Sequence, residues 1–365
     1  MALALRFNVD MSLSLIIPCL NEEESLPNTL TRAKRAFEKA LENEELEIVV
    51  VDNASTDRSA EVAREYGARV LREEKRGYGA AILRGLKEAK GDYLVIGDAD
   101  GTYDFEDALP LVEDLKAGAE FAIGNRLTGL AEPGAMPWLH QNLGTPVLTA
   151  ILNSFYGGKI KDINCGLRAI SRDALSKLKL RSPGMEFASE MVIHANKAQL
   201  KISERPIRYY RRAGGEAKLR TFRDGWRHLR FILLFAPFQL FVLPAFLGFL
   251  IGLFLNFSDR FGIQVLSSLV ILSATQLLIF GVLAKAYLWT TDSFVVDRKF
   301  GVWVEKFRLE YGIIFSFALG ILGLLFLSFW DLKNLIRGST FLAAALQIFF
   351  SSFLLSILLF KKKNE

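Results

Sequence analysis

Cysteine and histidine are both scarce in this sequence, which has two cysteines and three histidines among its 365 residues. The two cysteines, Cys19 and Cys165, exclude the dense disulfide framework of a small secreted protein. The N-terminus shows no signal peptide, because its apolar run covers only residues 1–5 and Asn-Val-Asp interrupts it at 8–10. We therefore expect the polar part of the chain in the cytoplasm, with both cysteines as free thiols.

Charged residues are few within the long apolar stretches of the last part of the chain, beyond residue 231. This part contains four long apolar stretches, at residues 231–257, 264–289, 312–330 and 340–360. Each reaches the roughly 20 residues that a helix needs to cross a bilayer. Lys285 is the clearest charge within them. We expect residues 231–365 to form an all-α transmembrane domain of four helices with a basic C-terminal tail.

Lysine and arginine are unevenly distributed over the connections between these stretches. The middle connection and the C-terminus are rich in them, with Arg298, Lys299, Lys306, Arg308 and residues 361–363. The two outer connections hold fewer, namely Arg260, Lys333 and Arg337. Basic loops remain in the cytoplasm, so we expect a multi-pass membrane protein with both termini and the catalytic part on that side. The basic charge near the membrane also suits an anionic lipid surface.

A short basic and aromatic segment precedes the first apolar stretch. Residues 221–230 carry Phe222 and Trp226 among Arg223, Arg227 and Arg230. This composition is typical of an amphipathic helix that lies at a membrane surface. Nucleic acid also binds such stripes, but the position directly before an apolar span favours lipid. We therefore expect no nucleic-acid partner.

Apolar runs alternate with helix-like segments through residues 12–220, after an N-terminal extension at 1–11. Strands are predicted at 13–17, 46–51, 68–71, 119–124 and 202–209, together with the run that starts at Tyr93. This alternation is typical of an α/β domain with a doubly wound, mostly parallel sheet.

Two aspartates stand where the run from Tyr93 stops. Asp98 and Asp100 are one residue apart, so on an extended segment they point the same way. Ligands of open α/β sheets bind at the carboxyl ends of strands. Paired carboxylates there suit Mg²⁺ or Mn²⁺ bound together with substrate phosphates. The alternative is that both residues only end the strand, since Asp and Gly are common in turns.

Two further segments favour a nucleotide near these aspartates. Asp52 follows the run at 46–51, where it is placed to accept hydrogen bonds from a ribose or a nucleobase. Gly77 and Gly79 open a helix after two basic residues, and small residues there let a diphosphate approach backbone N–H groups. A Gly-x-Gly pair alone is weak evidence, but its position before the Asp98 run makes a nucleotide cradle the better interpretation.

Several motifs, in this order, resemble those of membrane-anchored family 2 glycosyltransferases of the polyprenol-phosphate (dolichyl-phosphate) sugar synthase type. They are Ile-Ile-Pro-Cys-Leu-Asn-Glu at 16–22, Val-Asp-Asn-Ala-Ser-Thr-Asp at 51–57, Gly-Asp-Ala-Asp at 97–100, Gly-Asn-Arg at 124–126, Asp-Ile-Asn-Cys-Gly-Leu-Arg at 162–168, Glu190, and Arg-x-x-Gly-x-x-Lys at 212–218. The resemblance covers residues 12–231 and implies a GT-A-like fold. It also implies a divalent metal, a nucleotide-sugar donor of the UDP-glucose or GDP-mannose type and a polyprenyl-phosphate acceptor.

The resemblance further implies roles for single residues. The nucleotide would be held by Pro18, Asn21, Glu22, Asp52, Gly77 and Gly79. Asp98 and Asp100 would bind the metal, and Arg126 and Arg168 would face the acceptor phosphate. Arg212 and Lys218 would lie on a loop that closes over the donor. For Arg126 and Arg168, salt bridges within the fold are the alternative.

Three places depart from the family pattern. Thr102 stands where glutamine is frequent, and Ala217 stands where a serine usually precedes the lysine. Residues 138–142 contain no arginine, although a second lipid-phosphate arginine is often found there. The sequence therefore does not identify a third metal ligand, the complete acceptor pocket or the sugar that is transferred.

The scarcity of histidine agrees with this chemistry. A lipid phosphate is already ionised near neutral pH, so no general base is needed to activate it. We expect one in-line displacement with inversion at the anomeric carbon, and cations that stabilise the leaving diphosphate. A processive polysaccharide synthase is an alternative, although the chain lacks a Gln-x-x-Arg-Trp motif. A nucleotidyltransferase and a non-catalytic scaffold or lipid flippase are others, and the apolar helices leave a homo-oligomer open.

Overall fold

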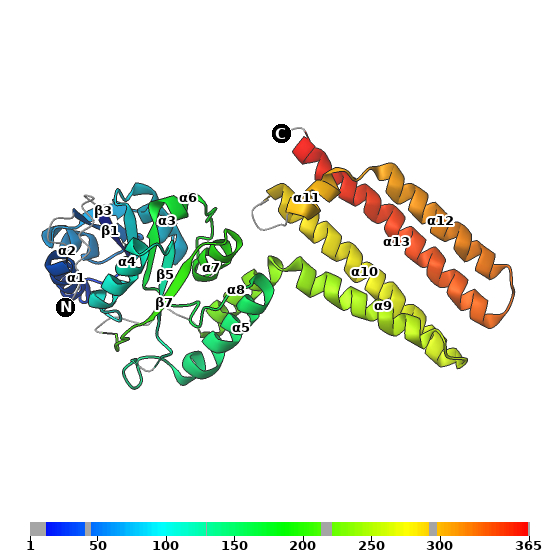
Figure 1. Cartoon of the computed structure of the whole chain (residues 1–365), viewed down its shortest axis with the longest axis horizontal. Coiled ribbons are helices and arrows are strands. Elements are labelled where there is room, and N and C mark those ends of the chain that lie inside the picture. The colour runs from blue at the N-terminus through cyan, green and yellow to red at the C-terminus, as the bar shows by residue number, and fades with distance from the viewer. Residues whose placement is uncertain (1–11, 41–44, 129, 213–220, 292–297, 364–365) are drawn as a thin grey trace. The chain divides into compact units, whose positions relative to one another are not determined.

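A computed structural model describes residues 12–40, 45–128, 130–212, 221–291 and 298–363 of the chain (Figure 1). The chain divides into two compact units, Met1–Ile232 and Leu233–Glu365. The first unit is built from strands and helices. The described part of the second unit is helical.

A seven-stranded sheet forms the centre of the first unit. Its strands lie in the order β3-β2-β1-β4-β6-β5-β7. Their bounds are β1 Leu13–Cys19, β2 Leu46–Asp52, β3 Arg69–Arg72, β4 Tyr93–Ile96, β5 Phe121–Asn125, β6 Arg168–Ser171 and β7 Ile202–Pro206. Neighbours pair in parallel except around β6, which runs antiparallel to β4 and β5. The mostly parallel, GT-A-like α/β fold is therefore confirmed.

Strand β6 was not among the predicted strands. It is four residues long and begins with Arg168, the last residue of a motif that we interpreted as part of a site. Its register places Ile170 opposite Leu94 of β4, and both side chains are fully buried. Long-range pairing of this kind leaves no local periodic signal in so short a segment.

The first unit also contains helices. They are α1 Leu26–Ala40, α2 Ser59–Glu65, α3 Tyr78–Glu88, the 3-10 turn η1 Phe105–Ala108, α4 Leu109–Lys116, the π-helical η2 His140–Gly144, α5 Thr145–Tyr156, α6 Arg172–Ser176, α7 Phe187–Lys197 and α8 Thr221–Leu234. Helix α3 packs on β1 and β2, and α4 on β5 and β6. Gly85 permits the first contact, because a Cβ atom there would lie 2.4 Å from Cγ2 of Ile16.

Helix α8 is tied to the first unit by two polar contacts. The Tyr156 hydroxyl of α5 donates to the carbonyl of Ile232 over 2.7 Å. Nδ1 of His228 lies 2.8 Å from Oγ of Ser189 in α7, and both residues are buried. The opposite face of α8 exposes Trp226.

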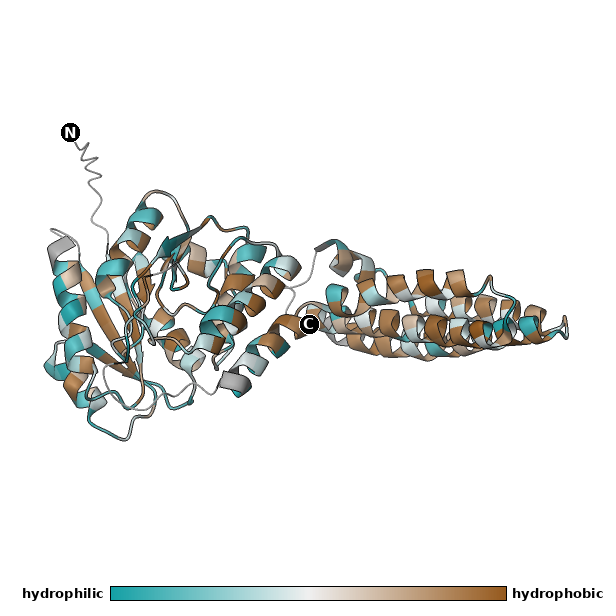
Figure 2. Ribbon diagram, turned by 90° about the horizontal axis from the view of Figure 1, so that it is seen from below, coloured by the Kyte–Doolittle hydropathy of each residue, from teal (hydrophilic) through white to brown (hydrophobic). Residues whose placement is uncertain are grey.

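The second unit contains η3 Phe238–Val242, α9 Leu243–Leu255, α10 Phe261–Thr291, α11 Arg298–Glu305, α12 Leu309–Leu327 and α13 Leu332–Lys363. Four segments are long and apolar enough to cross a membrane, at Phe238–Leu255, Phe261–Thr291, Leu309–Leu327 and Leu332–Leu359. Apolar residues predominate along these helices (Figure 2). A multi-pass membrane protein is therefore indicated. The first segment begins later than residue 231, because α8 ends at Leu234 and Pro237 lacks the N–H that a continuous helix needs.

Contacts near the helix ends show which connections of the second unit lie at the same end of its helix bundle. Val304 of α11 is buried together with Leu355 and Leu359 of α13, so the middle connection and the C-terminal part of α13 share one end of the bundle. Lys333 and Asp259, from the two outer connections, form a 2.8 Å ion pair.

Candidate active site

The segments after β1, β2 and β4 lie side by side at the carboxyl edge of the sheet. Strand β1 pairs with β2 and β4 in parallel, and Cys19 lies opposite Asp52. The loops continue this pairing, since Asn53 N donates to the Cys19 carbonyl over 2.8 Å and Gly97 N to the Ile16 carbonyl over 3.1 Å. The predicted nucleotide and metal segments therefore meet at one edge, and Pro18 lies within β1 beside them.

Asn21 joins the first two of these segments. Its Oδ1 accepts a hydrogen bond from Thr56 N over 2.8 Å, and its backbone N donates to Oγ of Ser55 over 3.0 Å. Its φ of 51° is a left-handed conformation that asparagine tolerates. Asp52 is 3% exposed and accepts from Ser55 N over 3.0 Å. Both residues organise the loops, and their contact with a nucleotide stays a prediction.

The Gly77-Tyr78-Gly79 turn packs closely against residues 182–184. A Cβ atom at Gly77 would lie 2.1 Å from the Pro183 carbonyl oxygen, and one at Gly79 equally close to that of Ser182. Gly79 N donates to the Gly184 carbonyl over 3.2 Å. These glycines are thus required by close backbone approach. The predicted diphosphate contact is a further role that stays a prediction.

Asp98 and Asp100 follow β4 directly and are both half-buried. The Tyr78 hydroxyl donates to Oδ1 of Asp98 over 3.0 Å. Thr102 donates to Oδ1 of Asp100 from its backbone N over 3.1 Å and from its hydroxyl over 2.7 Å. Burial, and then the charge of Asp100, raise the pKa of Asp98 to about 7. Two acidic side chains one residue apart therefore concentrate negative charge at this edge.

Arg212 lies against this acidic pair. Its Nη1 is 3.2 Å from Oδ2 of Asp100, and its Nη2 bonds to the carboxylate of Glu22. Glu22 is 7% exposed and also accepts from Oγ of Ser25 over 3.0 Å. Arg212 is separated from Asp100 by 112 positions in sequence. The structure thus brings together Glu22, Asp100 and Arg212, which are three of the predicted site residues. Lys218 lies outside the described residues.

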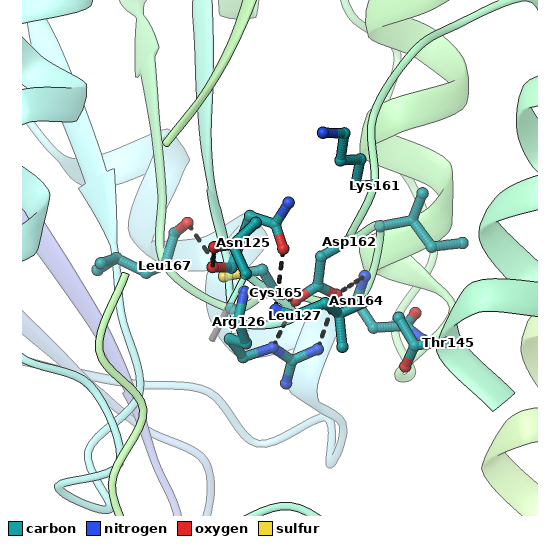
Figure 3. Close-up of polar contacts among 12 residues, drawn as sticks. Asn125, Arg126, Leu127, Thr145, Lys161, Asp162, Asn164, Cys165 and Leu167 are labelled. Carbon is teal, nitrogen blue, oxygen red and sulfur yellow. Dashed lines mark hydrogen bonds and ion pairs between the residues drawn. The ribbon is translucent and has the colours of Figure 1, made fainter. Parts of the chain in front are cut away.

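Arg126 forms a two-point ion pair with Asp162 (Figure 3). Its Nε lies 2.7 Å from Oδ2 and its Nη2 lies 2.9 Å from Oδ1 of that fully buried carboxylate. The guanidinium also stacks over the Tyr209 ring, 5.2 Å from its centroid. The alternative of a salt bridge within the fold therefore describes this contact, and an additional contact with the acceptor stays a prediction.

Arg168 is only 2% exposed and is surrounded by backbone carbonyls. Its Nε donates to Cys165 over 2.7 Å, its Nη1 to Ala188 over 2.9 Å and its Nη2 to Ile163 over 2.7 Å. All three nitrogens are thus engaged in holding the 162–168 loop against α7. This placement favours a structural role over contact with a lipid phosphate.

The carboxylates at this edge suit a metal ion whose remaining ligands come from the phosphates of the substrate. Among the described residues, no group of three or more His, Cys, Asp or Glu side chains is placed to hold a metal ion. Mg²⁺ is commonly bound by one or two carboxylates plus substrate phosphates, which the Asp98–Asp100 pair can satisfy. The guanidinium of Arg212 forms an ion pair with Asp100, so this carboxylate already binds a positive group.

Three residues of this site were missed in the sequence. Tyr78 contacts Asp98, Asn53 accepts from Gly77 N over 2.7 Å, and Asp162 holds Arg126. Each lay inside a motif that we had singled out. Their polar side chains, next to residues with assigned roles, were the available signal.

Comparison with known proteins gives consistent relatives. Residues 14–179 match the family model described as glycosyl transferase family 2. The low-salt glycan biosynthesis hexosyltransferase Agl6 of Haloferax volcanii is 42% identical over 282 residues, which cover 74% of this chain and 67% of that protein. The dolichyl-phosphate hexose transferase of the same organism is 30% identical over 58% of this chain and 89% of its own. The dolichol-phosphate mannosyltransferase of Pyrococcus furiosus is 30% identical over 60% of this chain and 63% of that protein.

Solved structures resemble this chain more distantly. A mycobacterial protein of solved crystal structure has a TM-score of 0.50 at 20% identity, over 62% of this chain and 74% of its own. Glucosyl-3-phosphoglycerate synthase from Mycobacterium tuberculosis, solved with Mn²⁺ and UDP-glucose, has a TM-score of 0.48 at 22% identity, over 61% and 78%. The first of these supports the fold alone. Taken with the sequence relatives, the ordered motifs and the sheet, the chain belongs to glycosyl transferase family 2, as the resemblance predicted.

Proposed function

We propose that this protein transfers one hexose from a nucleotide sugar to the phosphate of a polyprenyl lipid at the cytoplasmic face of a membrane. The observation that supports this most is the meeting of Asp98, Asp100 and Arg212 at the carboxyl edge of the sheet. The similarity to proteins named as dolichyl-phosphate hexose and mannose transferases supports the choice of hexose and acceptor.

The donor diphosphate would lie over the two aspartates. Asp98 and Asp100 would hold a divalent ion, Mg²⁺ or Mn²⁺, which supplies positive charge for the leaving diphosphate when it is bound. Arg212 would add a second positive group, because its guanidinium already lies beside Asp100. Lys218 would add a third from the same loop. Asn21, Glu22 and the other nucleotide residues predicted above would orient the base and ribose.

The displacement then needs no protein base. One phosphate oxygen of the lipid forms a bond to the anomeric carbon while the bond from that carbon to the donor's diphosphate breaks, so the configuration inverts. The acceptor is already an anion, and its electron pair is available without proton loss. We expect the guanidinium of Arg126, which lies over the Tyr209 ring, to be near the acceptor phosphate.

Exposed apolar side chains on η2, α5 and α8 support contact of the first unit with lipid. Leu143 and Val147 lie one helical turn apart on η2 and α5 and are 52% and 45% exposed. Trp138 precedes them and is 72% exposed, and Trp226 lies on α8. Helix α8 is joined to α5 by the Tyr156–Ile232 hydrogen bond. Exposed aromatic and aliphatic side chains of this kind suit the headgroup region of a bilayer, where a polyprenyl phosphate presents its charge.

The distribution of basic residues supports the cytoplasmic side. The end of the bundle formed by α11 and the C-terminal part of α13 has Lys299, Lys306, Arg308 and residues 361–363 in or beside it. The opposite end carries the Lys333–Asp259 pair, in which the charges offset each other. Basic ends are retained in the cytoplasm.

The test is a panel of labelled nucleotide sugars offered to membranes that contain the protein, together with undecaprenyl or dolichyl phosphate. The proposal expects label in the lipid extract for one donor, as a single hexose. A labelled polymer would favour a processive synthase. Absence of labelled lipid for every donor, in membranes where the folded protein is present, would contradict the proposed function.

A further inference from the structure

Asp98 and Asp100 each have one carboxylate oxygen engaged by a neutral donor of the chain. Tyr78 takes Oδ1 of Asp98, and Thr102 takes Oδ1 of Asp100. We propose that Tyr78 and Thr102 are positioning residues, which direct Oδ2 of each aspartate toward the divalent cation. This inference rests on the proposed function, because it deepens the description of the same site.

Thr102 holds Asp100 with two hydrogen bonds. Its backbone N and its hydroxyl both donate to the same oxygen, over 3.1 and 2.7 Å, and the residue is 5% exposed. The Thr102 carbonyl accepts from Tyr210 N over 2.9 Å, so the donor itself is fixed from behind. A carboxylate whose Oδ1 is held in this way cannot rotate freely, and its Oδ2 keeps one direction. That Oδ2 is the oxygen that faces the positive guanidinium of Arg212.

Tyr78 fixes the Asp98 carboxylate in the same way, with one hydrogen bond. It is the first residue of α3 and stands between Gly77 and Gly79, which dock on the 182–184 segment. Its hydroxyl therefore extends from a fixed backbone to Oδ1 of Asp98 over 3.0 Å. This bond links the start of α3, where a nucleotide diphosphate is expected, to the metal carboxylate.

Gly166 lies directly beside Oδ2 of Asp98. A Cβ atom at this position would lie 2.7 Å from Oδ2 and 3.1 Å from the Tyr103 hydroxyl. Gly166 N donates to that hydroxyl over 2.7 Å, so the backbone cannot easily withdraw. A methyl group there would have to displace the carboxylate oxygen that the inference assigns to the cation.

These contacts give the departure at Thr102 a physical meaning. In place of a side chain long enough to reach the cation, this position has a hydroxyl that orients a neighbouring ligand. Donors that orient metal ligands from outside typically change metal affinity by about 10-fold to 100-fold when they are removed. Loss of either hydroxyl should therefore change metal affinity, a property that is measured separately from turnover.

The experiment measures Mn²⁺ affinity of the full-length protein in detergent, from the electron paramagnetic resonance signal of free Mn²⁺, with UDP and with GDP. Thr102→Val and Tyr78→Phe remove a hydroxyl, whereas Thr102→Ser keeps one. Thr31→Val and Tyr66→Phe are matched controls, because the Thr31 hydroxyl donates to the Pro27 carbonyl of its own helix and Tyr66 is 39% exposed on the surface. Gly166→Ala tests the space at Oδ2. Melting temperature and circular dichroism are recorded for every variant.

We expect Thr102→Val and Tyr78→Phe to weaken Mn²⁺ binding about 10-fold or more, and Thr102→Ser to remain within about threefold of the unmodified protein. Gly166→Ala should weaken binding as well, and both controls should bind normally. Unchanged affinity in folded Thr102→Val and Tyr78→Phe would overturn the inference. So would equal losses in Thr102→Ser and Thr102→Val, since a lost hydroxyl would not explain them. Tight Mn²⁺ binding by a protein that transfers no hexose would contradict the proposed function and leave the positioning roles standing.

Discussion

Arg212 and Asp100 lie in contact although they are 112 positions apart in sequence, with Nη1 of the arginine 3.2 Å from Oδ2 of the aspartate. The same guanidinium bonds to Glu22, so two acidic residues from different loops share one positive group. The arginine thus stands beside the carboxylate that is expected to take the divalent ion. We therefore expect Arg212 to compete with that ion in the absence of donor and to assist the diphosphate in its presence.

Replacing Arg212 by methionine should therefore have effects of opposite sign. Without nucleotide, Mn²⁺ should bind about 10-fold more tightly, because a competing positive charge within about 4 Å is gone. With donor and acceptor, hexose transfer should fall by about 10²-fold to 10³-fold, as is typical when one group that stabilises developing charge is removed.

Arg211→Met is the matched control for this change. Arg211 is exposed and its Nε donates to the Pro133 carbonyl over 3.0 Å. It should leave both Mn²⁺ affinity and transfer nearly unchanged. Weaker Mn²⁺ binding by Arg212→Met in the absence of nucleotide would contradict the proposal that this arginine competes with the cation.

The pKa of Asp98 predicts how metal binding depends on pH. Burial and the Asp100 charge raise this pKa to about 7, so below that value the carboxyl group carries a proton that competes with the cation. Apparent Mn²⁺ affinity should rise with pH up to about 7 and level off above it, as titrations on both sides of this value would show. In Asp98→Asn the affinity should be low and the rise near 7 absent. An affinity of the unmodified protein that does not change through this range would contradict the prediction.

Arg168 should contribute to stability more than to acceptor binding. Arg168→Met leaves three buried carbonyls without their donor, and each costs about 1–3 kcal/mol, so unfolding free energy should fall by at least about 3 kcal/mol. Arg72→Met is the control, since Arg72 is exposed on β3 and surface changes usually stay within about 0.5 kcal/mol. Chemical denaturation followed by fluorescence measures both. A stable Arg168→Met protein with a raised KM for polyprenyl phosphate would instead favour direct acceptor contact.

The exposed apolar side chains on η2, α5 and α8 should matter for lipid acceptors. Leu143→Glu or Trp226→Glu places a charge where we expect lipid headgroups and acyl chains to begin. Transfer to a long polyprenyl phosphate in nanodiscs should decrease, whereas transfer to a short, water-soluble prenyl phosphate should change little. Tyr66→Glu, at an exposed position on the C-terminal side of α2, is the control. Equal losses with both acceptors would argue against lipid contact at this surface.

Local patterns in the sequence predicted much of this molecule. The strand ends of β1 and β2 agree within two residues with the runs at 13–17 and 46–51, because apolar runs stop where polar loops begin. The four apolar helices were identifiable for the same reason. Strand β6 was not, since four residues hold too little pattern to separate a strand from a loop.

Contacts between distant residues were beyond such patterns. Arg126 and Asp162 are 36 positions apart, and the choice between a salt bridge and an acceptor contact depended on where β5 and the 162–168 loop meet. Arg168 looked like a site residue because it ends a motif, yet its guanidinium lies among backbone carbonyls. Motifs therefore identified segments that meet at one edge of the sheet, and the fold decided which contacts their side chains make.

The most direct test of the central claim is the mass of the product made by purified full-length protein from its donor, Mn²⁺ and undecaprenyl phosphate. We predict one species, the lipid phosphate plus a single hexose, made by the unmodified protein and absent with a folded Asp100→Asn variant. A product that contains several sugars, or equal product from Asp100→Asn, would contradict the account.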